Sequence, residues 1–119
     1  MDEINKLIEG FARFRAKYFE NRPELFDQLS RKGQSPRVMV VACCDSRVDP
    51  AIITDSDPGD LFVVRNVANL VPPCEMGGGY HGTSAALEFA VRALEVKHIV
   101  VLGHSQCGGI QSLLQGIKA

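Results

Sequence analysis

Three short runs of apolar residues constrain the fold of this chain more than any other feature of its sequence. They span residues 38–42, 61–64 and 98–102, and none of them alternates regularly between polar and apolar side chains. Runs of this kind are typical of strands that are buried on both faces, as in parallel sheets. Helical patterns surround these strands, so the sequence predicts an α/β fold with a mostly parallel sheet of three strands flanked by helices.

The sequence ahead of the first strand predicts a helical arm. Residues 2–20 place apolar side chains at helical spacing, which indicates an amphipathic helix that packs on its own domain or on a partner subunit. Pro23 and Gly33 favour the beginning and the end of a second helix over Pro23–Lys32. The expected organisation is a single domain over residues 1–119, with an N-terminal amphipathic helical arm at 1–33 and an α/β core at 34–119.

The sequence after the second strand predicts a loop and two helices. Consecutive prolines and glycines indicate a loop over residues 71–82. Residues 83–96 are rich in alanine and predict a helix that begins at a Thr or Ser cap. Two further glycines precede another predicted helix over residues 110–117.

The composition of the chain excludes several classes of protein. Its 119 residues are 45% hydrophobic and 23% charged, which is typical of one globular domain rather than of a disordered segment. The net charge of −1 argues against nucleic acid as a partner, and no apolar run approaches the roughly 20 residues of a membrane span. The acidic start of the chain does not resemble a secretory signal, so we expect a cytoplasmic protein with a small-molecule substrate.

Metal-binding side chains follow two of the predicted strands, at the edge of the sheet where ligands bind in α/β folds. Cys43 and Cys44 come directly after the first strand, and His104 and Cys107 follow the third. Zinc prefers thiolate and imidazole ligands, and three protein ligands leave a position open for water, as in catalytic sites. His104 and Cys107 lie three residues apart and can reach one ion, and one thiolate from the first strand end would complete the set. Spacing alone leaves Cys43 and Cys44 as alternatives.

The alternation of side chains along an extended segment favours Cys43 over Cys44. Cys43, Asp45 and Arg47 share one side of such a segment, so an ion held by Cys43 would have an acid and a base beside it. Cys44 would then face the other way as a small buried hydrophobic residue, and Cys74 in the loop would have a structural or incidental role.

The pattern Cys43-x-Asp45-x-Arg47 with His104-x-x-Cys107 resembles the zinc signature of the β-class carbonic anhydrases. The likeness includes further segments of the chain and covers most of it from about residue 34 to residue 114. The resemblance implies one zinc ion held by Cys43, His104 and Cys107. It also implies the reversible hydration of carbon dioxide to bicarbonate and a proton by a zinc-bound hydroxide.

The same resemblance implies roles for residues around the metal. Asp45 and Arg47 would form a catalytic pair, in which Arg47 keeps Asp45 ionised and away from the zinc, so we expect an open site near neutral pH. Gln34 matches a position that binds substrate, often across a dimer interface. Gly108 matches a position whose backbone N–H donates to an oxyanion. The implied substrate-binding residues are Gln34, Phe62, Val67 and Gly108.

Members of the family are longer than this chain, and their sheet continues with a fourth parallel strand and a further edge strand. We therefore expect that the C-terminal part of the family domain is missing here, through truncation, supply by another chain, or a short variant. An uncovered sheet edge invites pairing, so we expect a homodimer or a higher homo-oligomer. Two alternative functions stay open: a zinc hydrolase acting on carbonyl sulfide or carbon disulfide, and a catalytically inactive zinc-binding fragment or assembly module.

Overall fold

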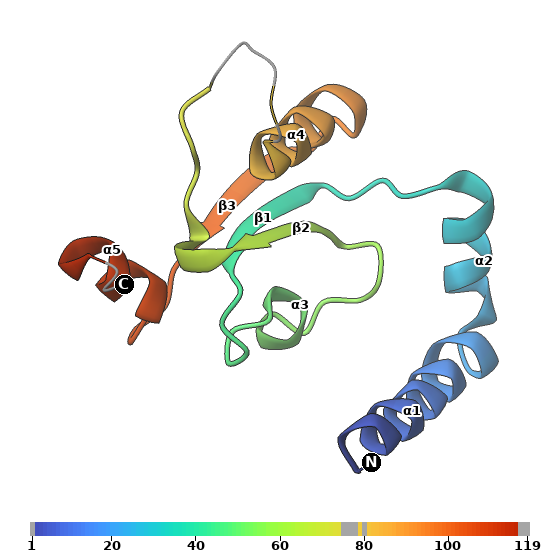
Figure 1. The fold of residues 1–119 in the computed structure, drawn as a ribbon. Coiled ribbons are helices and arrows are strands. Elements are labelled where there is room, and N and C mark those ends of the chain that lie inside the picture. The colour runs from blue at the N-terminus through green and yellow to red at the C-terminus, as the bar shows by residue number, and fades with distance from the viewer. Residues whose placement is uncertain (1, 75–78, 80, 117–119) are drawn as a thin grey trace. The chain divides into compact units, whose positions relative to one another are not determined.

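The computed structural model describes residues 2–74, 79 and 81–116 of the chain. It divides into two compact units, Met1–Gln34 and Ser35–Ala119. The second unit contains a three-stranded sheet in which every pairing is parallel, with helices between and after the strands (Figure 1). The predicted α/β class is therefore confirmed.

The first unit consists of two helices joined by a tight turn. Helix α1, Asp2–Arg15, runs into a single wider π turn over Ala16–Glu20, and helix α2 spans Pro23–Lys32. Gly33 follows α2 with a φ of 76°, a conformation that glycine adopts without steric cost. In the described part of the chain, no helix combines the length and the apolar character needed to cross a membrane.

Aromatic side chains join the two helices of the first unit. Phe14 meets Phe26 edge to face at 5.6 Å between ring centroids, and Phe19 stacks on Phe26 at 4.6 Å. Further out on α1, Leu7 and Phe11 are 69% and 61% exposed, and Phe11 meets Phe14 of the same helix at 5.9 Å between ring centroids. The amphipathic pattern thus forms a helix whose apolar face stays largely open within this unit.

The sheet of the second unit has the strand order β2-β1-β3. Strand β1 spans Val38–Cys43, β2 spans Leu61–Asn66 and β3 spans His98–Leu102. In the register, Cys43 lies opposite Asn66. Because all pairings are parallel, the carboxyl ends of the three strands meet at one edge of the sheet (Figure 1).

The prediction that the strands are buried on both faces holds for β1 and fails for β3. On β1, Met39 and Val41 are fully buried on one face, against Ala90. On β3, Val100 and Val101 are 43% and 54% exposed although they face opposite sides of the sheet. The physical reason is position: β1 lies between two strands, whereas β3 is an edge strand of the described sheet.

Two helices of the second unit differ from the sequence-based prediction. The short helix α3, Pro50–Ile53, was not predicted, because a single turn has no helical periodicity to detect. Helix α4 spans Gly82–Glu88 and continues as a π turn over Phe89–Ala93, so the regular helix is shorter than the predicted 83–96.

The predicted Thr or Ser cap of α4 is wrong. The residue before the helix is His81, and it makes no capping hydrogen bond with its side chain. The hydroxyl of Thr83 instead accepts a hydrogen bond from the side-chain amide of Asn66 at 3.2 Å, which ties the helix to the end of β2.

The last described helix, α5, spans Gly108–Gln115. It begins two residues before the predicted start at 110, directly after Cys107. Parts of the predicted loop, at 75–78 and 80, and the predicted end of the last helix at 117 lie outside the described residues.

Candidate metal centre

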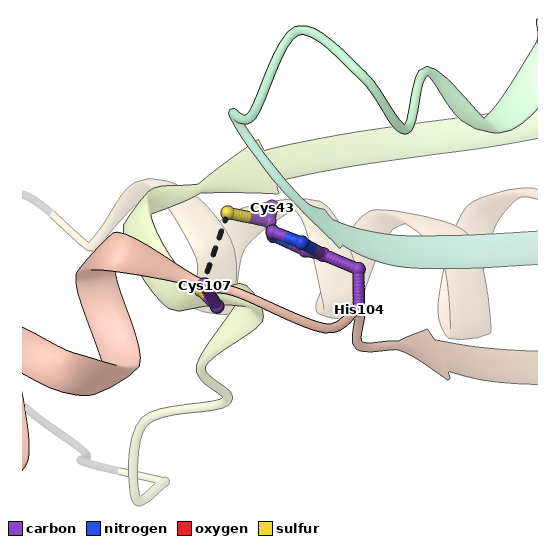
Figure 2. A group of neighbouring side chains, drawn as sticks. All are labelled: Cys43, His104 and Cys107. Carbon is purple, nitrogen blue, oxygen red and sulfur yellow. Dashed lines mark hydrogen bonds between the residues drawn. The ribbon is translucent and has the colours of Figure 1, made fainter.

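Three side chains with metal-binding atoms meet at the carboxyl edge of the sheet. Cys43 is the last residue of β1, and His104 and Cys107 lie in the loop between β3 and α5 (Figure 2). One donor atom from each lies within 4.8 Å of the others, and the two Sγ atoms are 3.8 Å apart. Cys43 and Cys107 are free thiols that are 5% and 7% exposed. The structure therefore brings together a compact and largely buried donor set.

The imidazole of His104 is oriented to offer a lone pair to this set. Its Nδ1 lies 2.8 Å from the carbonyl oxygen of Ser105, which can only accept, so Nδ1 carries the hydrogen. Its Nε2 is buried without a hydrogen-bond partner, an arrangement that costs free energy. Two thiols and an imidazole fit the ligand preferences of zinc, and binding of the ion would satisfy Nε2. The residues present thus fit the metal that the sequence predicts.

The side chains of Cys43 and His104 shift each other's pKa. The neighbouring imidazole of His104, and next the backbone N–H of Asp45, lower the pKa of the Cys43 thiol to about 7. Cys43 in turn raises the pKa of His104. Thiolate is the form that binds metals, so the surroundings of Cys43 favour its metal-binding form near neutral pH.

Asp45 and Arg47 form a close ion pair beside these ligands. Arg47 donates from Nε to Oδ1 of Asp45 at 2.9 Å and from Nη2 to Oδ2 at 2.6 Å, and these bonds hold the pKa of the carboxyl well below its usual range. Oδ2 of Asp45 lies 3.9 Å from Nε2 of His104. Arg47 also donates to the carbonyl oxygen of Gln106 at 3.1 Å, so it links the segment after β1 to the loop after β3.

The structure brings two of the four predicted substrate-binding residues close to the metal-binding side chains. Gly108 opens α5 immediately after Cys107, and the space in front of its Cα is open. Val67 is 68% exposed and lies against Gly109, the next residue of the same helix. Both residues therefore border the site.

A third predicted substrate-binding residue, Phe62, is not brought to the metal-binding side chains. Phe62 lies opposite Met39 in the register, four residues ahead of the Cys43–Asn66 pair, and packs beside Phe89 in the core under α4. Gln34 is the last residue of the first unit and remains a prediction.

The cysteines that were not predicted as ligands lie outside the donor set. Cys74 is exposed. Cys44 is also exposed, so its prediction as a buried hydrophobic residue is wrong. The reason is that β1 ends at Cys43, and Cys44 stands in the segment that leaves the sheet, where its N–H still bonds to the carbonyl of Asn66 at 2.9 Å.

A cavity of about 270 Å³ adjoins the donor set. Three of its lining residues were not singled out from the sequence. Gln106 has a φ of 56°, a left-handed conformation that cannot be predicted from a glutamine in the sequence. Ile110 packs against the buried cluster that contains Cys43 and Cys107, as an apolar residue of a helix does in any core. The cavity is lined by His104, Gln106, Cys107, Ile110 and Gln111.

Known proteins resemble this chain in sequence and in fold. A family model described as carbonic anhydrase matches residues 38–119. A carbonic anhydrase of Synechocystis is 49% identical over 112 residues, which cover 94% of this chain and 40% of that protein.

Solved structures give the same result. The β-carbonic anhydrase CcaA superposes with a TM-score of 0.87 at 48% identity, over 97% of this chain and 50% of that one. A structure from work on two tetrameric β-carbonic anhydrases of Sordaria macrospora gives a TM-score of 0.85 at 34% identity, over 99% and 57%. The chain thus spans about half the length of these relatives or less.

Proposed function

The chain belongs to the β-class carbonic anhydrase family, and we propose that it carries the zinc site of an enzyme that interconverts carbon dioxide and bicarbonate. The observation that carries the proposal is the meeting of Cys43, His104 and Cys107 beside an ion-paired carboxylate. In this proposal Cys43, His104 and Cys107 hold the zinc. When bound, zinc supplies Lewis acidity that lowers the pKa of water by several units, so water becomes a nucleophile near neutral pH.

The role proposed for Asp45 is to orient the nucleophile. Its carboxylate stays ionised because Arg47 donates to both of its oxygens, so it is a hydrogen-bond acceptor at any moderate pH. Because its Oδ2 lies 3.9 Å from Nε2 of His104, this carboxylate would be near enough to an ion held by His104 to accept a hydrogen bond from a nearby water molecule and so to orient it. Arg47 keeps this carboxylate from turning towards the metal, which supports an open site.

The proposed substrates suit the border of the site. Carbon dioxide is linear and uncharged, and the exposed Val67 offers an apolar wall beside α5. Bicarbonate carries a negative charge, and the backbone N–H of Gly108 at the first turn of α5 can donate to it. The proton released on hydration leaves to the buffer.

We propose that the enzyme is a homo-oligomer, either a dimer or a larger assembly. Phe62 lies four residues along β2 from the position opposite Cys43, so its contribution to a substrate cleft would come from a second copy of the chain. The family resemblance likewise assigns the position of Gln34 a role that often reaches across a dimer interface. The relatives from Sordaria macrospora are described as tetrameric. A cytoplasmic location is proposed as well, because a reducing compartment keeps the thiols of Cys43 and Cys107 available to a metal.

The decisive experiment measures carbon dioxide hydration by the purified 119-residue chain after zinc loading, with a pH indicator in stopped flow. Asp45→Asn should lower turnover about tenfold to a hundredfold while zinc stays stoichiometric, because the carboxylate acts on the nucleophile and does not hold the metal. Unchanged turnover in Asp45→Asn would remove the role proposed for this residue. Parallel assays with carbonyl sulfide and carbon disulfide separate the two apolar substrate classes.

Two observations favour a second candidate, a zinc-binding fragment or assembly module without turnover. The chain covers 40% of its Synechocystis relative, and β3 exposes residues on both faces of the sheet. A fully zinc-loaded chain that hydrates no carbon dioxide would support this candidate over the enzyme.

A further inference from the structure

Arg65 lies behind the segment that carries Cys43 and Asp45. It is the fifth residue of β2 and lies opposite Ala42 of β1 in the register. Phe62 and Val64 of the same strand pack into the core under α4, so Arg65 projects from the opposite face of the sheet. There its side chain is 25% exposed.

The guanidinium of Arg65 makes three polar contacts. Nε donates to the carbonyl oxygen of Cys43 at 2.8 Å, and Nη2 donates to the carbonyl oxygen of Asp45 at 2.8 Å. Nη1 lies 3.2 Å from Oδ2 of Asp49. The planar fork of an arginine side chain offers donors in fixed directions, so the contacts to these three residues constrain one another.

Asp49 holds this guanidinium in place from the other side. Its Oδ1 accepts the backbone N–H of Ala51 at 3.1 Å, which caps α3, while Oδ2 receives Arg65. Each oxygen of the carboxylate thus has a separate partner. The ion pair of Arg65 with Asp49 therefore joins β2 to the start of α3, and the other two bonds of Arg65 join both to the end of β1 and the segment after it.

The two carbonyls that Arg65 binds belong to Cys43 and Asp45, whose side chains point to the candidate metal site. Cys43 directs its Sγ to the donor set, and Asp45 directs its carboxylate to within 3.9 Å of His104. The chain leaves the sheet between them, where the N–H of Cys44 still bonds to the carbonyl oxygen of Asn66 at 2.9 Å. The bonds from Arg65 add to this by fixing the carbonyl groups of Cys43 and Asp45, one residue on either side of Cys44.

We propose that Arg65 is a positioning residue of the metal centre. Held by Asp49, it fixes the carbonyls of Cys43 and Asp45 and so sets the Cys43 thiolate and the Asp45 carboxylate at their working separation. This inference rests on the proposed function for the identity of the site as a zinc centre. Arg65 touches neither ligand atom nor substrate and acts through the backbone.

The test compares Arg65→Gln, Arg65→Lys and Asp49→Asn in the 119-residue chain, with Arg92→Gln as a matched control. Arg92 is 80% exposed and pairs with Glu88 one turn away on the same helical segment. The readouts are the absorption spectrum of the cobalt(II)-substituted protein, which reports thiolate coordination geometry, and zinc affinity from competition with a chelator. Far-UV circular dichroism and the urea midpoint follow folding separately.

Arg65→Gln should weaken zinc binding about tenfold to a hundredfold and alter the thiolate-to-cobalt absorption at full helix content, as loss of outer-shell partners does. Arg65→Lys should recover part of this loss, because one ammonium cannot reproduce the fork. Asp49→Asn keeps an oxygen for the cap of α3 and should show a smaller loss. Arg92→Gln should behave as wild type.

A wild-type cobalt spectrum and zinc affinity in Arg65→Gln would overturn the inference. If that variant does not fold, the same result in Arg65→Lys would overturn it. If the wild-type protein binds cobalt through thiolates but hydrates no carbon dioxide, the proposed function would be overturned. The positioning role of Arg65 would still stand. If the wild type is fully active and Arg65→Gln keeps the wild-type cobalt spectrum and zinc affinity, the positioning role would be overturned and the proposed function would stand.

Discussion

At the scale of single residues, the alternation of side chains picks out Cys43 rather than Cys44, and in the structure Cys43 lies with His104 and Cys107. The argument holds because β1 runs one residue beyond its apolar run, to Cys43. It fails for Cys44, since burial on the far side would require the strand to continue. The position of Phe62 could not be obtained in this way, because it depends on the register between β1 and β2 rather than on local spacing.

The difference in burial among the four cysteines predicts a pattern of chemical labelling. In zinc-loaded protein, iodoacetamide should modify the exposed Cys44 and Cys74 rapidly. The buried Cys43 and Cys107 should react only after the metal is removed with a chelator, because coordination occupies both thiolates. Peptide mass spectrometry with and without chelator measures this. Equal labelling of Cys43 before and after chelation would contradict its assignment as a ligand.

A second prediction at this scale concerns the close approach of α5 to the turn after β2. A Cβ at Gly109 would lie 2.6 Å from Cγ1 of Val67 and 3.0 Å from the backbone nitrogen of Ala68. Gly109→Ala should therefore lower the free energy of unfolding by about 1–3 kcal/mol, as overpacking does. At Gly108 a Cβ would meet no described atom within 4 Å beyond its chain neighbours and the backbone of its own helix, so Gly108→Ala is the matched control. Equal urea midpoints for the two variants would contradict the close contact.

At the scale of elements, the three strands were predictable because each is a dense apolar run, and the parallel arrangement followed from the helices around them. Helix α3 was not predictable from periodicity, although Asp49-Pro50 is a common helix start. The burial of a strand depends on its neighbours, which a run of apolar residues does not encode. This is why β1 and β3, which look alike in sequence, differ in exposure.

That difference predicts unequal costs of truncation on the two strands. Met39 on β1 is fully buried beneath α4, so Met39→Ala should destabilise the fold by about 2–5 kcal/mol through lost burial and a cavity. Val100 on β3 is 43% exposed, and Val100→Ala should change stability by less than about 1 kcal/mol. Urea denaturation followed by circular dichroism compares the two. A larger loss at Val100 would mean that β3 is covered in solution.

At the scale of the whole molecule, the candidate metal ligands lie in a chain whose described sheet has an open apolar edge at β3. The donor set needs only the ends of β1 and β3, so it forms within this chain. The sheet, in contrast, ends openly at β3. In the described sheet β3 pairs on one side only, with β1, and its Ile99 and Val101 are 47% and 54% exposed. Such an edge is a template for another strand. The donor set thus comes together in the described part of the chain without a further strand beyond β3.

We therefore expect the isolated 119-residue chain to self-associate through β3, with zinc bound. Val101→Lys should shift sedimentation velocity towards smaller species, because a charge on an edge strand opposes pairing. Ile52→Lys is the control, since Ile52 is 77% exposed on α3, away from this edge. Zinc content should stay equal in both variants, because neither residue contributes to the donor set. An equal drop in association for the two variants would instead point to nonspecific apolar contact, and β3 would not be the site of pairing.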